Sequence, residues 1–321
     1  MRSGELASLY HELAQLLRTG LPLSRAAETL ERGPLPPASR AMVRALRKAA
    51  DRGEGVAEVL AAVPPLDRAV LGAGEKSGHL DRCLGALATY HEALDRVRRT
   101  LIARCAYPLF LVHFGALVLA LPKLMMGGGP ARYLADVAGM LGWVYAALLI
   151  VGAGTLFLLR TARSSSAVER ILGLVPVLGG TVRQFAVARF CMAYGTQLGA
   201  GIPVLQALGT ASEVSGSARI RAAVNSALPR VQRGESPTPL LAGALPDPLV
   251  RGLVVGEETG TLDEELDRWA TWHRERGLAG LETLGEWVPR LLYFAVAGLL
   301  AWKIVGAYQQ VLSGYARALE F

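Results

Sequence analysis

The feature that most constrains the fold is an internal repeat, because a duplicated pattern requires the same local structure to form twice. Residues 17–23 (LRTGLPL) match residues 198–204 (LGAGIPV) at a separation of 181 positions. Residues 74–81 (GEKSGHLD) match residues 256–263 (GEETGTLD) at a separation of 182 positions. Because the matches occur in the same order, the sequence predicts two copies of one structural unit.

The repeated residues predict two helix-to-helix turns in each copy. A glycine after one helix and a proline at the start of the next are typical of such a turn. In the second turn, a Ser or Thr followed by Gly reverses the chain, and a carboxylate is suited to bond free amides at a helix start. We expect a structural or partner-docking role for Gly20, Pro22, Glu75, Gly78, Leu80, Gly201, Pro203, Glu257, Gly260 and Leu262.

Three apolar stretches predict transmembrane helices, since a helix needs about 20 mostly apolar residues to cross the hydrocarbon core of a bilayer. They are residues 107–126, which include His113 and Lys123, residues 139–159, which carry no charge, and residues 287–310, which include Lys303. Pro108 and Pro289 are equivalent positions in the repeat and stand at the start of the first and third stretches. For the third stretch, a buried helix of a soluble domain is the alternative.

Basic residues predict which side of the membrane each region occupies. Arginines cluster before the first stretch and after the second, as Arg96, Arg98, Arg99, Arg104, Arg160, Arg163 and Arg170. Positive charge beside a span favours the cytoplasmic side. We therefore expect residues 1–106 and 160–286 in the cytoplasm, residues 127–138 as a short periplasmic loop and residues 311–321 as a short periplasmic tail.

Both predicted cytoplasmic regions place apolar residues at helical spacing and almost never alternate as strands do. The chain is 52% hydrophobic with a formal charge of +7. We predict an all-α polytopic membrane protein with two repeated cytoplasmic antiparallel helical bundles and three transmembrane helices. Basic residues beside the spans favour anionic membrane lipid over nucleic acid as a partner. The start of the chain does not resemble a cleavable signal peptide.

Motifs that could carry chemistry predict no catalytic, cofactor or metal site. Residues 72–78 resemble part of a phosphate-binding loop, but Glu75 stands where that loop needs Gly, and no buried strand precedes it. His91 and His273 recur beside aromatic residues without metal-ligand spacing, so packing or an interface is favoured. The three cysteines, Cys83, Cys105 and Cys191, show neither zinc nor disulfide-framework spacing, which indicates a reducing compartment.

Three further polar features each leave an alternative open. His113 lies within a predicted span, where helix packing is favoured over a proton pathway. The acidic run between Glu257 and Asp267 is interpreted as a solvated helix start or a docking face for a basic partner. A divalent-cation site is the alternative. A basic face, formed by Arg44, Arg47, Lys48 and Arg52, is interpreted as a solvated surface or a contact to an acidic partner.

The repeated motifs resemble those of the type II secretion system F-domain family, the GspF/PilC-type inner-membrane platform proteins of secretion and type IV pilus assembly. That family combines a Gly-x-Pro turn, a Gly-Glu-x-(Ser/Thr)-Gly-x-Leu turn and a span that begins near a Pro. This sequence contains the combination twice, between about residues 6 and 310. Many members carry an extension before the first bundle, whereas the first helix predicted here starts near Met1.

The resemblance implies a non-enzymatic scaffold of the bacterial inner membrane, without cofactors. It implies as partners a hexameric secretion or pilus assembly ATPase, other inner-membrane assembly proteins, pilin or pseudopilin subunits, membrane lipid and further copies of the chain. A membrane transporter or channel subunit is the alternative, although transporters usually have more spans and broken helices near the midplane. A membrane-tethered enzyme would need convergent titratable groups.

Overall fold

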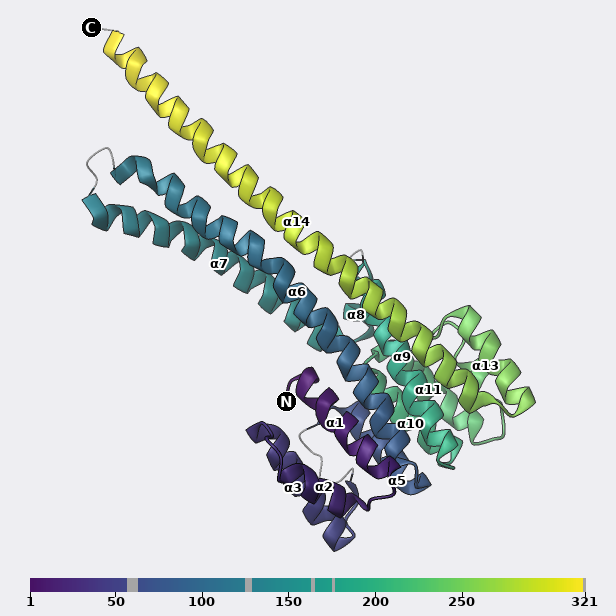
Figure 1. Cartoon of the computed structure of the whole chain (residues 1–321). Coiled ribbons are helices and arrows are strands. Elements are labelled where there is room, and N and C mark those ends of the chain that lie inside the picture. The colour runs from purple at the N-terminus through teal and green to yellow at the C-terminus, as the bar shows by residue number, and fades with distance from the viewer. Residues whose placement is uncertain (57–62, 125–128, 163–164, 175–176, 320–321) are drawn as a thin grey trace. The chain divides into compact units, whose positions relative to one another are not determined.

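The computed structural model describes residues 1–56, 63–124, 129–162, 165–174 and 177–319, and these are almost entirely helical (Figure 1). The helices are α1 (Ser3–Arg18), α2 (Leu23–Glu31), α3 (Pro37–Arg52), α5 (Pro65–Ser77), α6 (Leu80–Lys123), α7 (Gly129–Ala162), α8 (Ser166–Gly173), α9 (Leu178–Gly199), α10 (Val204–Ser215), α11 (Ala218–Val231), α12 (Pro237–Leu240), α13 (Asp247–Thr259) and α14 (Leu262–Leu319). Within the described ranges, β pairing is limited to an isolated bridge between Ala242 and Leu245. The all-helical prediction is confirmed.

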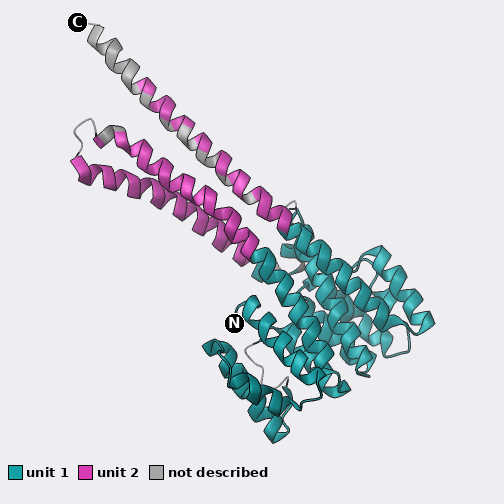
Figure 2. Cartoon of the chain, in the orientation of Figure 1, with its two compact units in different colours: residues 1–98, 159–281 teal, residues 99–158, 282–321 magenta. Residues whose placement is uncertain are grey.

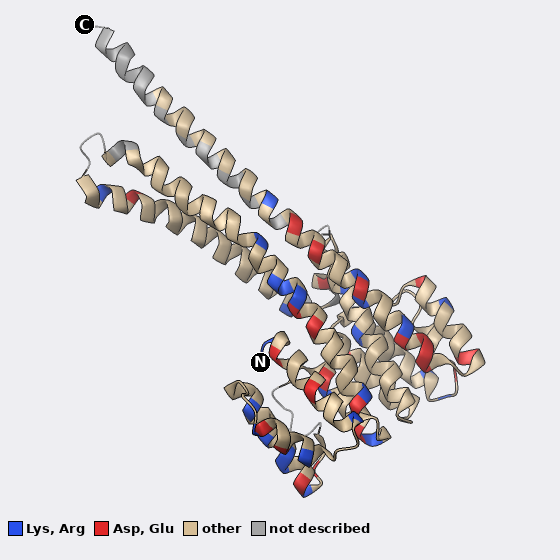
Figure 3. Cartoon of the chain, in the orientation of Figure 1, with Lys and Arg blue, Asp and Glu red and all other residues tan. Residues whose placement is uncertain are grey.

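The chain divides into two compact units (Figure 2). Unit 1 comprises residues 1–98 and 159–281, and unit 2 comprises residues 99–158 and 282–321. Helices α6, α7 and α14 each continue from one unit into the other. Charged residues occur throughout unit 1 and are sparse along the helices of unit 2 (Figure 3).

Unit 1 contains both copies of the repeat around one hydrophobic core. In the first copy, Leu9, Leu13 and Leu87 are buried in this core, and in the second copy, Phe190 and Tyr194 belong to the same cluster. Helix α5 of the first copy packs against α9 and α10 of the second. The two copies, expected as bundles within residues 1–106 and 160–286, therefore pack together in one unit.

Unit 2 contains long apolar helices whose large side chains are largely exposed, including Trp143 and Phe157. Helices α6 and α7 approach each other through the small residues Ala116 and Ala120, as is common between membrane helices. Within the described residues, Leu80–Leu121 and Gly129–Thr161 are the helical stretches long and apolar enough to cross a membrane. The third span stays a prediction. Its Lys303 side chain and that of Lys123 lie outside the described part of the chain.

The structure differs from the expected loop after the first span. Residues 129–138 are the first turns of α7 and not a loop, because Pro130 suits a first helical turn and the following residues continue the helix. The remaining residues of the expected loop, 127 and 128, lie outside the described ranges, as does Arg163.

The prolines at the predicted span starts lie inside continuous helices. Pro108 is within α6 and Pro289 within α14. A proline removes one helical hydrogen bond, and helices that enter a membrane tolerate it because neighbouring groups satisfy the freed carbonyl.

Candidate docking surfaces and the repeated turns

The first repeated turn has the same backbone geometry in both copies. Gly20 follows α1 with φ +84°, and Gly201 follows α9 with φ +72°. This left-handed conformation favours glycine because it has no Cβ. Pro22 and Pro203 directly precede α2 and α10 with extended ψ values, so each turn closes one helix and directs the next.

The second repeated turn is a left-handed helix end followed at once by another helix. Gly78 has φ +72° and Gly260 has φ +74°. The next amide reaches back in each copy, from His79 to the Gly74 carbonyl and from Thr261 to the Gly256 carbonyl, both at 2.9 Å. This is the Schellman arrangement, which satisfies helix carbonyls that would otherwise lack donors. Helices α6 and α14 then begin at Leu80 and Leu262.

We call the repeated segments 74–81 and 256–263, which begin with Gly-Glu, the GE motifs, and their turns the GE turns. The first glycine of each GE motif permits the two helices of the turn to approach closely. A Cβ on Gly74 would lie 2.6 Å from the Cys83 Sγ and 3.2 Å from the Leu80 Cα. A Cβ on Gly256 would lie 3.1 Å from the Leu262 Cα. The sequence motif alone assigns no role to Gly74 or Gly256, and the packing within each hairpin supplies one.

The two glutamates of the motif each accept a hydrogen bond from a backbone amide within their own copies. Glu75 Oε2 accepts a hydrogen bond from the Val56 amide at 2.8 Å. Glu257 Oε1 accepts one from the Thr238 amide at 3.2 Å, and its carboxylate also accepts from the Thr238 and Ser236 hydroxyls. Amides at helix starts have no partner within the helix, so the Glu257 carboxylate caps the start of α12. Val56 and Thr238 are separated by 182 positions, as Glu75 and Glu257 are.

A buried polar triad in the first copy was not foreseen. Asp67 is fully buried, and its Oδ2 accepts a hydrogen bond from the Tyr10 hydroxyl at 2.9 Å and lies 2.8 Å from His91 Nε2. Burial, with the charge and hydrogen bond of Asp67, raises the pKa of Tyr10. The equivalent positions of Tyr10 and Asp67 in the second copy are Cys191 and Leu249. The triad therefore distinguishes two otherwise similar copies.

The second-copy histidine has a different partner. His273 is buried, with Nδ1 2.5 Å from the Gln184 Oε1. Burial lowers the pKa of His273 to about 4, assisted by the positive charges of Arg276 and Arg183. No group of three or more His, Cys, Asp or Glu residues in the described ranges is arranged to hold a metal ion.

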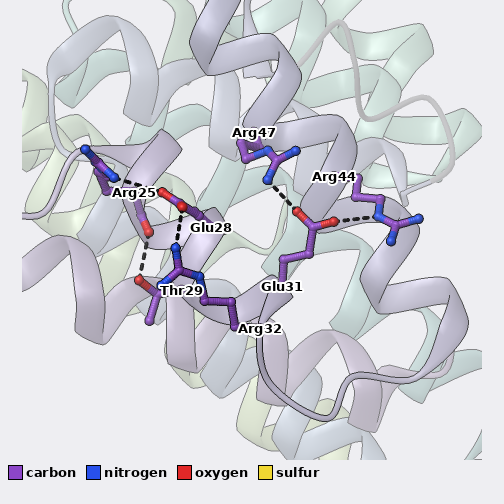
Figure 4. Close-up of polar contacts among 7 residues, drawn as sticks. All are labelled: Arg25, Glu28, Thr29, Glu31, Arg32, Arg44 and Arg47. Atoms are coloured by element: carbon purple, nitrogen blue, oxygen red, sulfur yellow. Dashed lines mark hydrogen bonds and ion pairs between the residues drawn. The ribbon is translucent and has the colours of Figure 1, made fainter.

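Helices α2 and α3 form a basic surface with two internal ion-pair clusters (Figure 4). Residues 23–52 contain seven basic and three acidic residues, for a net charge of +4. Glu31 lies 2.6 Å from Arg44 Nε and 2.8 Å from an Arg47 nitrogen, and Glu28 pairs with Arg25 and Arg32. Hydrogen bonds from these arginines lower the pKa of both glutamates. The face remains positive because arginines and Lys48 outnumber the carboxylates.

An acidic surface lies around the GE turn of the second copy. Four carboxylate side chains there are exposed, those of Glu258, Asp263, Glu264 and Asp267. Two others are engaged, since Glu257 caps a helix start and Glu265 pairs with Arg268. The predicted acidic and basic faces therefore belong to different copies of the repeat.

The remaining candidates lie in helices. Residues 72–77 belong to α5, so the segment that resembled a phosphate-binding loop is helical. In unit 2, His113 Nε2 lies 3.1 Å from the Tyr145 hydroxyl, and its Nδ1 lies 2.7 Å from the Leu109 carbonyl oxygen. The Tyr145 contact joins α6 to α7, which supports a helix-packing role for this histidine.

Comparison with known proteins supports the duplication seen in sequence and structure. The sequence matches the family profile "Type II secretion system (T2SS), protein F" twice, over residues 9–127 and 190–308. The two matches confirm the predicted repeat.

Similar proteins cover most of the chain. The "Type 4 fimbrial assembly protein PilC" of Pseudomonas putida is 29% identical over 94% of this chain and 82% of its own length. The "Type II secretion system protein F" of Pseudomonas aeruginosa is 30% identical over 92% of this chain and 79% of its own length. The "Type IV pilus assembly protein PilC" of Thermus thermophilus is 25% identical over 95% of this chain. The chain belongs to the type II secretion system protein F family, whose domain it carries in two copies.

Proposed function

We propose that this chain is a non-enzymatic inner-membrane platform that couples a cytoplasmic secretion ATPase to pilin or pseudopilin assembly. Unit 1 provides docking surfaces in the cytoplasm, and the helices of unit 2, including a third span within α14, provide contacts in the membrane. Movement imposed on unit 1 by the ATPase is transmitted along α6, α7 and α14 and lifts subunits from the bilayer into a filament.

The observation that supports this proposal most is the continuity of three helices across the boundary between the units. A helix transmits displacement along its axis because its hydrogen bonds and packed side chains resist deformation. The exposed basic and acidic faces of unit 1 supply different chemistry for different soluble partners. The glutamates of the GE turns are engaged within the fold, so docking is assigned to these faces and not to those glutamates.

A deletion strain complemented with the full chain tests the proposed function. We expect the deletion to abolish either surface filaments or secretion of an exported protein, and the full chain to restore it. A variant with Arg44→Glu and Lys48→Glu should insert into the membrane normally but restore fewer filaments or less secretion than the unchanged chain, because it reverses the charge on the basic face. Arg251→Glu, at an exposed position of α13, is the matched control. Unchanged filaments and secretion in the deletion strain would contradict the proposal, and solute uptake that depends on the chain would favour a transporter.

A further inference from the structure

Helix α8 exposes apolar side chains where a surface helix normally exposes charged ones. Ala167, Arg170, Ile171 and Leu174, the residue that follows the helix, are exposed and lie on one face at positions i, i+3, i+4 and i+7. Gly173 is also exposed but has no side chain. Ile171 is 56% exposed and Leu174 is 80% exposed, and the nearby Val177 is 40% exposed. Leu172, on the other side of the helix, is buried. The face turned away from unit 1 is therefore apolar with a single arginine.

Contacts with α11 fix the rotation of α8. Glu169 accepts hydrogen bonds from the Ser217 hydroxyl at 2.6 Å and from the Arg219 amide at 3.0 Å. Ser217 is the residue that caps the start of α11. An eight-residue helix is not stable alone in water, so packing of Leu172 and these bonds hold it. Because they engage one side, Ile171 and Leu174 remain on the other.

The chain connects α8 directly to a helix apolar enough to cross a membrane. Helix α7 ends at Ala162 and α8 begins at Ser166, a link that spans at most about 14 Å when fully extended. The Ser165 amide donates a hydrogen bond to the Thr161 carbonyl at 2.9 Å, which shortens the link further. Arg160 is exposed in the last turn of α7. Any surface that α8 contacts must therefore lie close to the end of the α7 span.

We propose that Arg170, Ile171, Leu174 and Val177, which we call the α8 anchor, bind the lipid surface of the membrane next to α7. The aliphatic side chains enter the boundary between headgroups and acyl chains, as in interfacial helices. The Arg170 guanidinium pairs with lipid phosphate while its stem stays among the apolar residues. The anchor seats the second copy of the repeat on the bilayer.

The surroundings of the anchor favour lipid over a soluble protein or a second copy. A lipid surface is present wherever α7 crosses a membrane, whereas a protein partner would have to occupy the same narrow layer beside the span. Anionic phosphate complements Arg160 and Arg170. The proposal concerns lipid contact alone, so its test does not depend on the partners proposed above.

Depth-dependent fluorescence quenching of the full chain tests the anchor. The fluorophore NBD is attached to Leu174→Cys in a Cys105→Ser background and the protein is placed in nanodiscs that hold one copy each. Cys83 and Cys191 are buried, and burial raises the pKa of the Cys83 thiol to about 11, which suppresses labelling there. Val255→Cys, at an exposed apolar position of α13, is the matched control.

The anchor predicts emission at shorter wavelength for NBD at position 174 than at 255. Lipids brominated near the headgroup end of the acyl chain should lower its intensity about twofold at 174 and leave 255 unchanged, given an insertion depth of roughly 5–10 Å. Arg170→Glu should weaken quenching in phosphatidylglycerol and have less effect in phosphatidylcholine. Water-like emission at 174 without quenching overturns the proposal. Short-wavelength emission without quenching also overturns it, because protein would then cover the site.

Discussion

At the scale of single residues, Glu75 and Glu257 link each GE turn to a backbone amide 19 positions earlier, and in the second copy this amide is at the start of α12. The carboxylate is needed because a helix start presents amides without acceptors. The following residue, Lys76 or Glu258, is exposed and differs in charge between the copies. One position of the motif thus serves the fold, while its neighbour is free to vary.

Replacement of either glutamate by alanine should loosen the backbone segment whose amide donates to it. Loss of a capping acceptor costs about 0.5–2 kcal/mol, so we expect faster amide hydrogen exchange around Val56 in Glu75→Ala and around Thr238 in Glu257→Ala. Mass spectrometry of the purified full chain measures this. Glu258→Ala is the control, and equal exchange in all three variants would show that the caps do not contribute. Glu75→Lys and Glu257→Lys should impair assembly through this same loss, with the protein retained in the membrane.

The buried His273 predicts a pH dependence of stability with a defined sign. Its pKa is lowered from 6.5 to about 4 in the folded chain, so the unfolded chain binds the proton first as pH falls. Above pH 6.5 the side chain is neutral in both states and contributes no pH dependence. Between pH 6.5 and about 4 the free energy of unfolding decreases as the pH is lowered. Below about pH 4 this loss of stability is complete, on the order of 3 kcal/mol.

The variant His273→Gln should remove this component while it keeps a polar group near Gln184. Thermal unfolding in detergent, followed from above pH 6.5 to near 4, should therefore show a smaller decline than the unmodified chain. His79→Gln, at an exposed histidine, should retain the full decline. Parallel curves for the chain and His273→Gln would contradict the assignment.

At the scale of secondary-structure elements, each GE motif builds a tight helical hairpin. The left-handed glycine ends the first helix, and the preceding glycine lets the second helix approach its backbone. The hairpins α5–α6 and α13–α14 lead into long helices. The turn therefore determines the direction in which each long helix leaves unit 1.

Alanine at Gly74 or Gly256 should separate the helices of the hairpin. The added Cβ would lie within 3.2 Å of a Cα in the next helix, and overpacking of this kind typically costs about 1–3 kcal/mol. We expect lower thermal stability for both variants in detergent. Gly209→Ala is the control because no atom lies within 4 Å of its added Cβ, so alanine should be neutral or slightly stabilising there. Equal stability of all variants would argue against the close approach.

Sequence reasoning found the features that depend on local chemistry. Glycine and proline restrict the backbone where they stand, so the turns at Gly20 and Gly78 and their counterparts could be predicted. The partners of Asp67 and Glu169 could not, because they lie 57 and 48 positions away and depend on tertiary packing. A carboxylate next to Leu66 and three residues before Val70 was the available signal for Asp67. The loop predicted over residues 127–138 was wrong from residue 129 onward, where α7 begins. The run of glycines ends at residue 129, so the following residues are free to form a helix.

At the scale of the whole molecule, the duplication produces two similar copies that each carry a charged face of a different sign. The first copy presents the basic α2–α3 face, and the second presents the acidic residues around Asp263. Both copies share one core, so a partner bound to either face acts on the same body. We infer that the copies diverged in surface and retained their internal turns.

The third span predicts the location of the C-terminus. If residues 287–310 cross the membrane, alkaline phosphatase fused after Phe321 reaches the periplasm and is active, whereas fusion after Ala162 leaves it inactive. Low activity of both fusions would reduce the spans to two and make α14 a helix on the cytoplasmic side.

The most direct test of the platform account is crosslinking of the tagged chain in native membranes, followed by identification of the proteins that copurify. The account predicts recovery of a hexameric ATPase together with pilin-like subunits, and loss of the ATPase alone when the charges at Arg44 and Lys48 are reversed. Efficient recovery of the chain without either partner would contradict it.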